Sequence, residues 1–453
     1  MKRAKPQQSG ATDRGGCQGV TVRILFNRVS ALVGQRTGIG HYAGELYRAL
    51  RTHAGPDEVR GLPTRWSIPV NRWIGCHCSS EINRRIEQRT QQLQVARPTG
   101  SRNPFAWLGW QARRIRIGDR LRSCVCRKLQ ERMARHFRYC LTRDYCDLYH
   151  EPNYVPLECD VPTVITVCDV SPLLHPEWHP ADRVAFFERS FRDGLKQCVH
   201  VLTISEFSRR EIIHALGIAP ERVTTTYLGA RPGMRRLPAA TCAPVLRRHD
   251  LSWGQYVLCV GTLEPRKNLD RLLRAYCDLP SELRSRCGLV LAGAWGWQAE
   301  QLREFYESEG RAKGVRHLGY TPETDLAALY SGARALAFPS LYEGFGLPPV
   351  EMHACGGAVL ASTAAAVAEV LQGSQAALIE PHDLTAWRDA LARAITDDDW
   401  LAGLRRGAEE HAARFSWDAC AQTTMRVYRQ LQGVDLTQAL GRQPSTGALR
   451  AAG

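Results

Sequence analysis

Residues 338–351 read Phe-Pro-Ser-Leu-Tyr-Glu-Gly-Phe-Gly-Leu-Pro-Pro-Val-Glu and decide the fold of the second half of this 453-residue chain. The apolar run 333–338 is typical of a strand, and Pro348 suits the first turn of a helix. A strand, a glycine turn and a helix start aim free N–H groups at one point, which favours an anion. Glu343 and Glu351 would face the same ligand, for which a phosphate with sugar hydroxyls is the simplest choice. The alternative is a tight strand–helix connection that binds nothing.

A second stretch, Val-Gly-Thr-Leu-Glu-Pro-Arg-Lys-Asn at 260–268, repeats the pattern of strand, glycine turn and helix start. It places Arg266 and Lys267 at the end of a predicted strand. Such a pair suits a diphosphate, because Arg forms paired hydrogen bonds and Lys supplies a point charge. Arg-Lys pairs are common on surfaces, but two glycine turns, two cations and two carboxylates together indicate a binding site.

Short apolar strands alternate with helices in both halves, which predicts βαβ units and parallel sheets. The expected strands are 20–26, 148–150, 163–167, 200–204, 256–260, 288–292, 315–318, 333–338 and 358–361. The expected helices are 42–50, 182–197, 268–278, 298–310, 324–330, 384–394 and 416–432. We therefore expect an α/β fold of two doubly wound, Rossmann-like domains that face each other across a cleft, where ligands bind at the carboxyl ends of the strands.

The predicted domain boundaries follow from these patterns. The first domain spans 20–232 and the second 254–415, with an aperiodic linker at about 231–253. The last helix, within 416–433, is expected to cross back onto the first domain. The polar ends, 1–19 and 434–453, are predicted to be disordered tails.

The net charge of +15 lies in one segment. Residues 60–143 hold nineteen Lys/Arg and four Asp/Glu, together with Trp66, Trp73, Trp107 and Trp110. Basic residues interleaved with Trp suit an anionic membrane surface. A solvated, arginine-rich insertion is an equal alternative. Nucleic acid is disfavoured, because no nucleic-acid motif accompanies the charge.

The sixteen cysteines are expected to be reduced core residues. The pairs within 76–78 and 124–126 have Cys-x-Cys spacing rather than the usual Cys-x₂-Cys, so we expect no metal. No apolar run is long enough to span a membrane, and the first nineteen residues lack a signal peptide's apolar region. We expect a cytoplasmic protein, peripheral on the inner face of a membrane.

The motifs at 261–269 and from Glu343 to Glu351 resemble the group 1 glycosyltransferases (family GT4) over about 20–433, apart from 60–143. That resemblance implies a GT-B fold and a retaining, metal-independent hexosyltransferase that uses a nucleotide sugar and no cofactor. The form of 261–268 resembles the mannosyltransferase branch. GDP-mannose is therefore the first expectation for the donor and a UDP-hexose the second, with a lipid-linked saccharide or a polysaccharide as acceptor.

The resemblance also implies roles for single residues. Glu351 should bind the ribose, Glu343 should contact the donor sugar, and Arg266 and Lys267 should neutralise the diphosphate as it leaves. Asp169 completes the catalytic set. The remaining donor-binding candidates are Gly38, Gly40, Gly261, Phe345, Gly346 and Leu347. Gly38 to Gly40 resembles the glycine loop that lies beside the donor phosphates.

One departure from the family concerns the first domain. Members often read Val-His-Asp-Leu where this chain has Val-Cys-Asp-Val at 167–170. Cys168 cannot replace an imidazole, so either Asp169 with His150 or His175 supplies the polar contact, or activity is reduced. His150 and Cys168 are the candidates for contact with the acceptor. A catalytically silent GT-B protein is the corresponding alternative. The family-like segment 205–208 is expected to cap the next helix through Glu206 and Ser208.

Overall fold

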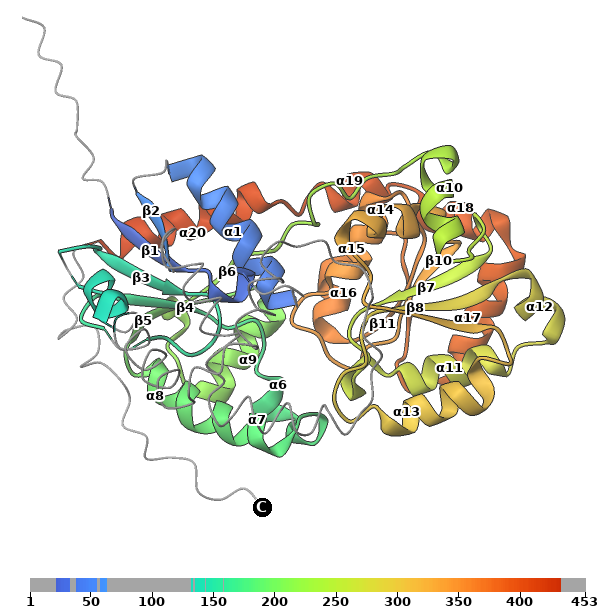
Figure 1. The fold of residues 1–453 in the computed structure, drawn as a ribbon, viewed down its shortest axis with the longest axis horizontal. Helices are drawn as coiled ribbons and strands as arrows, with labels where there is room; N and C mark the ends of the chain where they lie inside the picture. Colours follow the sequence, from blue (N-terminus) through green and yellow to red (C-terminus); the bar gives the residue numbers. More distant parts are fainter. Residues whose placement is uncertain are drawn as a thin grey trace, which may run out of the picture.

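The computed structural model describes residues 22–32, 38–54, 58–62, 132, 135–142, 144–157 and 159–432. The predicted tails and nearly all of the basic segment 60–143 lie outside these residues. The described chain forms two six-stranded parallel sheets, each covered by helices on both faces (Figure 1). We call the parts built on the first and second sheets the first and second domains.

The first sheet has the strand order β2-β1-β3-β4-β5-β6, and every pair is parallel. Its strands are β1 (Ile24–Asn27), β2 (Val59–Leu62), β3 (Leu148–Glu151), β4 (Thr163–Thr166), β5 (Cys198–Thr203) and β6 (Val223–Thr225). The main helices around it are α1 (Gly38–Ala54), α6 (Ser171–Leu174), α7 (Ala181–Phe186), α8 (Arg192–Leu195) and α9 (Glu206–Leu216). A π-helical turn, η3 (Phe187–Phe191), joins α7 to α8, so the helix predicted at 182–197 is nearly continuous.

The second sheet has the order β12-β11-β10-β7-β8-β9, again with parallel pairs. Its strands are β7 (Tyr256–Val260), β8 (Gly288–Ala292), β9 (Val315–Gly319), β10 (Ala335–Phe338), β11 (Val359–Ser362) and β12 (Ala377–Ile379). Its helices include α11 (Leu269–Cys277), α12 (Ser281–Arg286), α13 (Glu300–Phe305), α14 (Glu323–Gly332), α15 (Leu347–Ala354), α16 (Ala365–Leu371), α17 (Leu384–Thr396), α18 (Asp398–Arg405) and α19 (Ala408–Ala412).

The strand order of the second sheet brings together the two loops that form the site. Strands β7 and β10 are hydrogen-bonded neighbours although strands β8 and β9 lie between them along the chain. The loops that leave their carboxyl ends therefore start side by side and run to opposite sides of the sheet. In open α/β sheets, ligands bind at such a reversal of strand order.

Burial explains why these strands are apolar throughout. Parallel strands covered on both faces bury side chains in both directions, so they show continuous apolar runs rather than alternation. Every residue of β7 is buried, as is every residue of β10. Two apolar clusters fill the two faces of the second sheet, one against α11 and α17 and the other against α10 (Ala239–Arg248) and α14.

The last helix, α20 (Trp417–Gln430), returns to the first domain and packs along α1 (Figure 1). Its Tyr428 hydroxyl bonds Nδ1 of His150 on β3, and Nε2 of the same imidazole lies 2.8 Å from the Thr166 hydroxyl. His150 is fully buried, and burial lowers its pKa to about 3. This histidine thus ties α20 to the sheet as a neutral side chain.

One part of the predicted organisation is wrong. The segment at 231–253, which we predicted to be an aperiodic linker, contains helix α10 (Ala239–Arg248). Cys242 and Leu246 of this helix are buried against α14, so α10 belongs to the second domain. Its Pro244 and its alanine and arginine content hide the apolar spacing from sequence reasoning.

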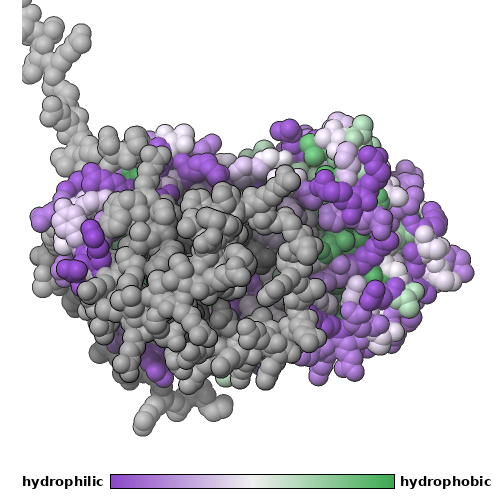
Figure 2. All heavy atoms as spheres, in the orientation of Figure 1, coloured by the Kyte–Doolittle hydropathy of each residue, from purple (hydrophilic) through white to green (hydrophobic). Residues whose placement is uncertain are grey.

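Figure 2 shows the face of the molecule drawn in Figure 1, on which the visible surface of the second domain is mainly hydrophilic with scattered hydrophobic residues. Among the described residues, no helix is both long and apolar enough to cross a membrane.

Candidate functional site

The loop between β10 and α15 takes its shape from two glycines. Gly346 caps α15 with φ of 109°, a left-handed conformation that favours glycine. Gly344 needs to be glycine for another reason: a Cβ there would lie 2.3 Å from the carbonyl oxygen of Cys168 in the first domain. The loop therefore touches the first domain through its backbone, and Glu343 precedes that contact directly.

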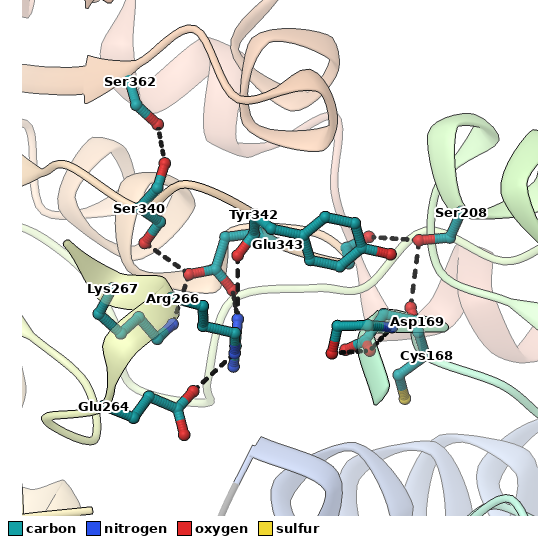
Figure 3. Close-up of polar contacts among 12 residues, drawn as sticks. Cys168, Asp169, Ser208, Glu264, Arg266, Lys267, Ser340, Tyr342, Glu343 and Ser362 are labelled. Atoms are coloured by element: carbon teal, nitrogen blue, oxygen red, sulfur yellow. Dashed lines mark hydrogen bonds and ion pairs between the residues drawn. The ribbon is translucent and has the colours of Figure 1, made fainter. Parts of the chain in front are cut away.

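Glu343 joins the two loops of the second domain (Figure 3). Its Oε2 accepts a hydrogen bond from Nη1 of Arg266 at 2.7 Å, and its Oε1 is paired with Nζ of Lys267. The Ser340 hydroxyl also donates to Oε1, at 2.7 Å, while the Ser340 carbonyl accepts a bond from Ser362 at 2.6 Å. The two motifs recognised in the sequence are thus one cluster in space.

The ionisation of this cluster follows from its surroundings. Burial raises the pKa of the Glu343 carboxyl, but the charges of Lys267 and Arg266 and their hydrogen bonds outweigh it and lower the pKa to about 2. Glu343 is therefore a carboxylate at neutral pH. The Arg266 guanidinium is protonated as well, since the nearby carboxylates raise its pKa despite burial.

The cations of the cluster are balanced by carboxylates. Nε of Arg266 lies 2.6 Å from Oε1 of Glu264, and its Nη1 also donates to the Tyr342 carbonyl at 3.1 Å. Two cations and two carboxylates give the group no net charge. Because the group has no excess of positive charge, it can bind a diphosphate only if a carboxylate moves away from the cations or becomes protonated.

The loop after β7 is fixed by local geometry. Gly261 has φ of 147°, and its N–H donates to the Ala292 carbonyl at 3.0 Å. Asn268 adopts a left-handed conformation, with φ of 54°, and its side-chain amide donates to the carbonyls of Pro339 and Pro381 at 3.1 and 2.7 Å. These bonds attach the loop to its neighbours and hold Arg266 and Lys267 toward Glu343.

Glu351 lies on α15 and is completely buried. Its Oε2 accepts hydrogen bonds from Nη1 of Arg231 at 2.8 Å and from the Tyr330 hydroxyl at 2.9 Å. Its Oε1 has no hydrogen-bond partner among the described residues. Burial raises the pKa of this carboxyl, against the charge of Arg231, which lowers it. Glu351 thus keeps one free acceptor oxygen, which a hydroxyl group could use.

The same loop forms much of the boundary between the domains. The Ser208 hydroxyl of α9 lies 3.2 Å from the carbonyls of both Cys168 and Gly344, so it bridges the domains. The Tyr342 side chain enters the first domain, where its hydroxyl donates to Glu211 of α9. Aromatic rings of the first domain surround it, those of His175, Trp178 and Phe207.

A second carboxylate strengthens this boundary. Glu369 of α16 accepts hydrogen bonds from the backbone N–H groups of Glu206 and Phe207, at 2.8 and 2.7 Å. These are orphan donors of the first turn of α9. The predicted cap through Glu206 and Ser208 is wrong, because Ser205 supplies the capping oxygen, which accepts from the Ser208 N–H at 3.0 Å.

The first-domain candidates occupy different places. Asp169 faces the Glu343 group across the domain boundary (Figure 3) and accepts two hydrogen bonds from Ser171, from its N–H at 3.0 Å and its hydroxyl at 2.8 Å. Cys168 is a buried thiol whose pKa burial raises, so it is protonated. His175 stacks on Trp178, with ring centroids 4.0 Å apart.

Three of the other predicted site residues lie away from the Glu343 group or adopt a different local structure from the one predicted. His150 is buried between β3 and α20, so the structure gives no support for a contact with an acceptor. Gly38 and Gly40 do not form the predicted loop, since both lie in the first turn of α1. That helix meets the second domain through His41, whose Nε2 lies 3.4 Å from Glu323. Phe345 is buried against Phe415, and Leu347 begins α15.

Sequence reasoning missed several polar residues of the site. Arg231 was assigned to the linker, and no motif in the sequence indicated Glu211 or His179. Tyr342 could have been found from the sequence, because it directly precedes Glu343. Among the described residues, no group of three His, Cys, Asp or Glu side chains could hold a metal ion; the segments 76–78 and 124–126 lie outside them.

Known proteins are similar to this chain in sequence and in fold. Residues 253–414 match the family model of the group 1 glycosyl transferases. The O-antigen chain mannosyltransferase B of Escherichia coli is 38% identical over 291 residues, which cover 64% of this chain and 76% of that protein. The serotype-specific mannosyltransferase WbdA of Escherichia coli is 32% identical over 321 residues, 66% of this chain but only 38% of that protein.

Solved structures give the fold. Anabaena HepE, crystallised with UDP and glucose, has a TM-score of 0.58 at 17% identity and covers 90% of this chain and 99% of its own. WaaG, a glycosyltransferase involved in lipopolysaccharide biosynthesis, has a TM-score of 0.60 at 14% identity and covers 89% and 99%. With its two six-stranded parallel sheets and these structural neighbours, the chain has the GT-B fold, as predicted. The chain belongs to the group 1 glycosyltransferases.

The close approach of Gly344 to Cys168 gives a direct test of the domain contact. We expect Gly344→Ala to lower the free energy of unfolding by about 1–3 kcal/mol, the usual cost of overpacking a tight contact. The matched control is Gly403→Ala in α18, where a Cβ would have no neighbour within 4 Å. Denaturant unfolding of both variants measures the effect, and equal stability of the two would contradict the contact.

Proposed function

We propose that this glycosyltransferase moves a hexose from a nucleotide sugar to a saccharide acceptor with retention of anomeric configuration and without a metal ion. Mannose from GDP-mannose is the first choice, and a lipid-linked saccharide or a polysaccharide is the acceptor. The observation that supports this most strongly is the buried Glu343 carboxylate shared by Arg266 and Lys267 at the strand-order reversal of the second sheet.

The proposed chemistry uses this cluster to hold the leaving group. Glu343 turns to hydroxyls of the donor sugar, so Arg266 and Lys267 exchange its carboxylate for the diphosphate. The bond between the anomeric carbon and the phosphate oxygen breaks, and its electron pair stays on the diphosphate, whose charge the two cations stabilise. The acceptor oxygen bonds the anomeric carbon on the same face, and its proton passes to the leaving phosphate oxygen. Asp169 lies on the acceptor side of this reaction.

The nucleotide would use the neighbouring helix. In this proposal, the ribose hydroxyls donate to Glu351, whose Oε1 is available and whose Oε2 is held by Tyr330 and Arg231. Since Glu351 is completely buried, binding requires a local movement, and the long Arg231 side chain can supply it. The backbone of residues 345–347 and the start of α15 would then lie beside the diphosphate.

The names of the relatives favour mannose. The two Escherichia coli relatives described above are mannosyltransferases, whereas HepE was crystallised with UDP and glucose at much lower identity. A UDP-hexose is therefore the second choice. A panel of GDP-mannose, UDP-glucose, UDP-galactose and UDP-N-acetylglucosamine tests the donor by thermal shift and by release of nucleotide. We expect GDP-mannose to give the largest shift, because a bound ligand stabilises in proportion to its affinity.

The same panel separates an enzyme from a catalytically silent binding protein. A silent GT-B protein, suggested by Cys168, would bind a nucleotide sugar without releasing nucleotide from it. If no donor is bound or turned over, the glycosyltransferase function itself is excluded.

The charge balance of the cluster predicts an unusual variant. Glu343→Gln keeps the size of the side chain but removes the negative charge that competes for Arg266 and Lys267. We expect GDP to bind at least as tightly as to the unchanged protein, while turnover of GDP-mannose falls by about a hundredfold or more. Isothermal titration and a turnover assay measure the two effects. A parallel loss of GDP binding and turnover would show that Glu343 is needed to hold the cations in place.

The acceptor side carries an arginine-lined hollow of about 570 Å³ between η1 (Val29–Leu32) and α1. Arg28, Arg48 and Arg51 line it, together with Tyr47. Arg48 is paired with Glu45, and none of the residues that line the hollow is acidic. This surface and the basic segment 60–143 support an anionic acceptor at a membrane surface, and we propose a peripheral position on the inner face of the cytoplasmic membrane.

Vesicle binding tests the membrane proposal. Strand β2 and the buried residues Cys140 and Leu141 belong to the fold, so the deletion has to be confined to residues 63–131. We expect this deletion to abolish binding to phosphatidylglycerol vesicles and to leave hydrolysis of GDP-mannose within about twofold. Retained vesicle binding would exclude the segment as the membrane contact. Tight, salt-dependent binding of nucleic acid by the full chain would instead favour a nucleic-acid-binding role for this segment.

A further inference from the structure

His179 is a buried imidazole at the domain boundary that no motif indicated. It follows the short helix η2 (Pro176–Trp178), and only 3% of it is exposed. Trp297 and Gln298 of the second domain lie against this segment. The Trp297 indole N–H donates to the Trp178 carbonyl at 2.7 Å, and the Gln298 amide lies 3.5 Å from the His179 carbonyl. The imidazole therefore lies where the two domains meet.

A hydrogen-bond chain connects this imidazole to Asp169. The Ser171 hydroxyl donates to Oδ1 of Asp169 at 2.8 Å and lies 3.0 Å from Nε2 of His179. A serine hydroxyl has a single proton, and the carboxylate receives it. The Ser171 oxygen must therefore accept from His179, which places the imidazole proton on Nε2.

The other ring nitrogen is then a free acceptor. Burial, with the charge of Arg183, lowers the pKa of His179 to about 4, so the ring is neutral at pH 7. With the proton on Nε2, the atom Nδ1 carries a lone pair and no proton. Nδ1 is buried and has no hydrogen-bond partner among the described residues. A buried polar atom without a partner is uncommon and calls for a ligand or a structural cause.

The chemistry of this atom restricts what can occupy it. A lone pair accepts a proton donor, so a diphosphate oxygen is excluded and a hydroxyl group fits. Ser171 links His179 to Asp169, which faces the Glu343 group across the domain boundary (Figure 3), so the imidazole lies near the catalytic candidates of both domains. Hydroxyl groups enter this region on the hexose of the donor or on the acceptor sugar.

We propose that His179 binds a hexose hydroxyl of the reactants, its Nδ1 accepting the hydrogen bond while Ser171 and Asp169 fix the ring through Nε2. This inference rests on the proposed function and deepens it, because it assigns the imidazole that Cys168 does not supply. His179, rather than His150 or His175, is then the histidine of the reaction centre.

The test uses two conservative variants with opposite effects. In His179→Gln, the amide nitrogen replaces Nε2, so the bond to Ser171 is kept and the acceptor at Nδ1 is lost. In His179→Asn, the shorter amide replaces Nδ1, so an acceptor is kept and the bond to Ser171 is lost. The matched control is His200→Gln on β5, a buried histidine that bonds the Thr224 hydroxyl through Nε2 at 2.8 Å.

The full chain is assayed with GDP-mannose, both for hydrolysis and for transfer to methyl α-mannoside, and with the single-deoxy analogues of both sugars. We expect His179→Gln to lower kcat/KM about tenfold, the value of one hydrogen bond, and His200→Gln to leave it within twofold. With the unchanged protein, one deoxy analogue should have a kcat/KM about tenfold lower than the complete sugar. With His179→Gln, the same analogue and the complete sugar should have equal kcat/KM values. A loss in hydrolysis assigns that hydroxyl to the donor, whereas a loss in transfer alone assigns it to the acceptor.

Three results would overturn the inference. The first is an unchanged kcat/KM of His179→Gln. The second is that every deoxy analogue lowers the kcat/KM of His179→Gln by the same factor as that of the unchanged protein. The third is a larger loss of kcat/KM for His179→Asn than for His179→Gln.

Thermal unfolding shows whether His179→Gln folds. If it does not, the deoxy analogues are assayed with His179→Asn instead. A bound hydroxyl then predicts that His179→Asn keeps part of the activity and still prefers the complete sugar to the deoxy analogue. Inactivity of the unchanged protein with every nucleotide sugar is a different result, which refutes the proposed function.

Discussion

The buried Glu343 carboxylate, shared by Arg266 and Lys267, is the interaction on which the rest of the site depends. Removing one partner of a buried ion pair leaves an uncompensated charge, so Arg266 and Lys267 need an anion beside them, and Glu343 supplies it. The pairing is possible because β7 and β10 are neighbours in the sheet, which brings together loops more than seventy residues apart in the chain. Fold and site therefore share one cause, the reversal of strand order in the second sheet. The balanced charge of the group also explains how two cations are kept buried.

The loop that carries Glu343 also determines how the domains meet. Tyr342, on one side of Glu343, bonds Glu211, and Gly344, on the other side, touches the Cys168 backbone. The position of the carboxylate is thus coupled to the contact between the domains. The first domain contributes Asp169 and His179 at the same boundary. In the proposed reaction, a donor on the second domain would therefore meet polar groups of the first domain only while this contact is formed. A retaining transfer needs such closeness, because the acceptor attacks on the face that the diphosphate leaves.

Local patterns in the sequence were sufficient for much of this fold. Strands β7 and β8 begin and end where their apolar runs do, and both strand–turn–helix motifs are present. The patterns fail where long-range contacts decide. Helix α10 has no clear apolar spacing, and its Pro244 disguises it. Arg231 reaches Glu351 across 120 residues, and His179 acquires its role from Ser171 and from the second domain, so neither has a local signature. His150 shows the converse: its place near the motif suggested reactivity, but a central strand buries it against α20.

The central claim is that Arg266 and Lys267 exchange the Glu343 carboxylate for a diphosphate. A crystal structure of the chain with GDP bound tests this most directly. We expect the diphosphate oxygens within hydrogen-bond distance of both cations, the ribose hydroxyls on Glu351, and the Glu343 carboxylate turned away from at least one of the two cations. A diphosphate bound elsewhere, with the ion pairs of Glu343 intact, would contradict the claim.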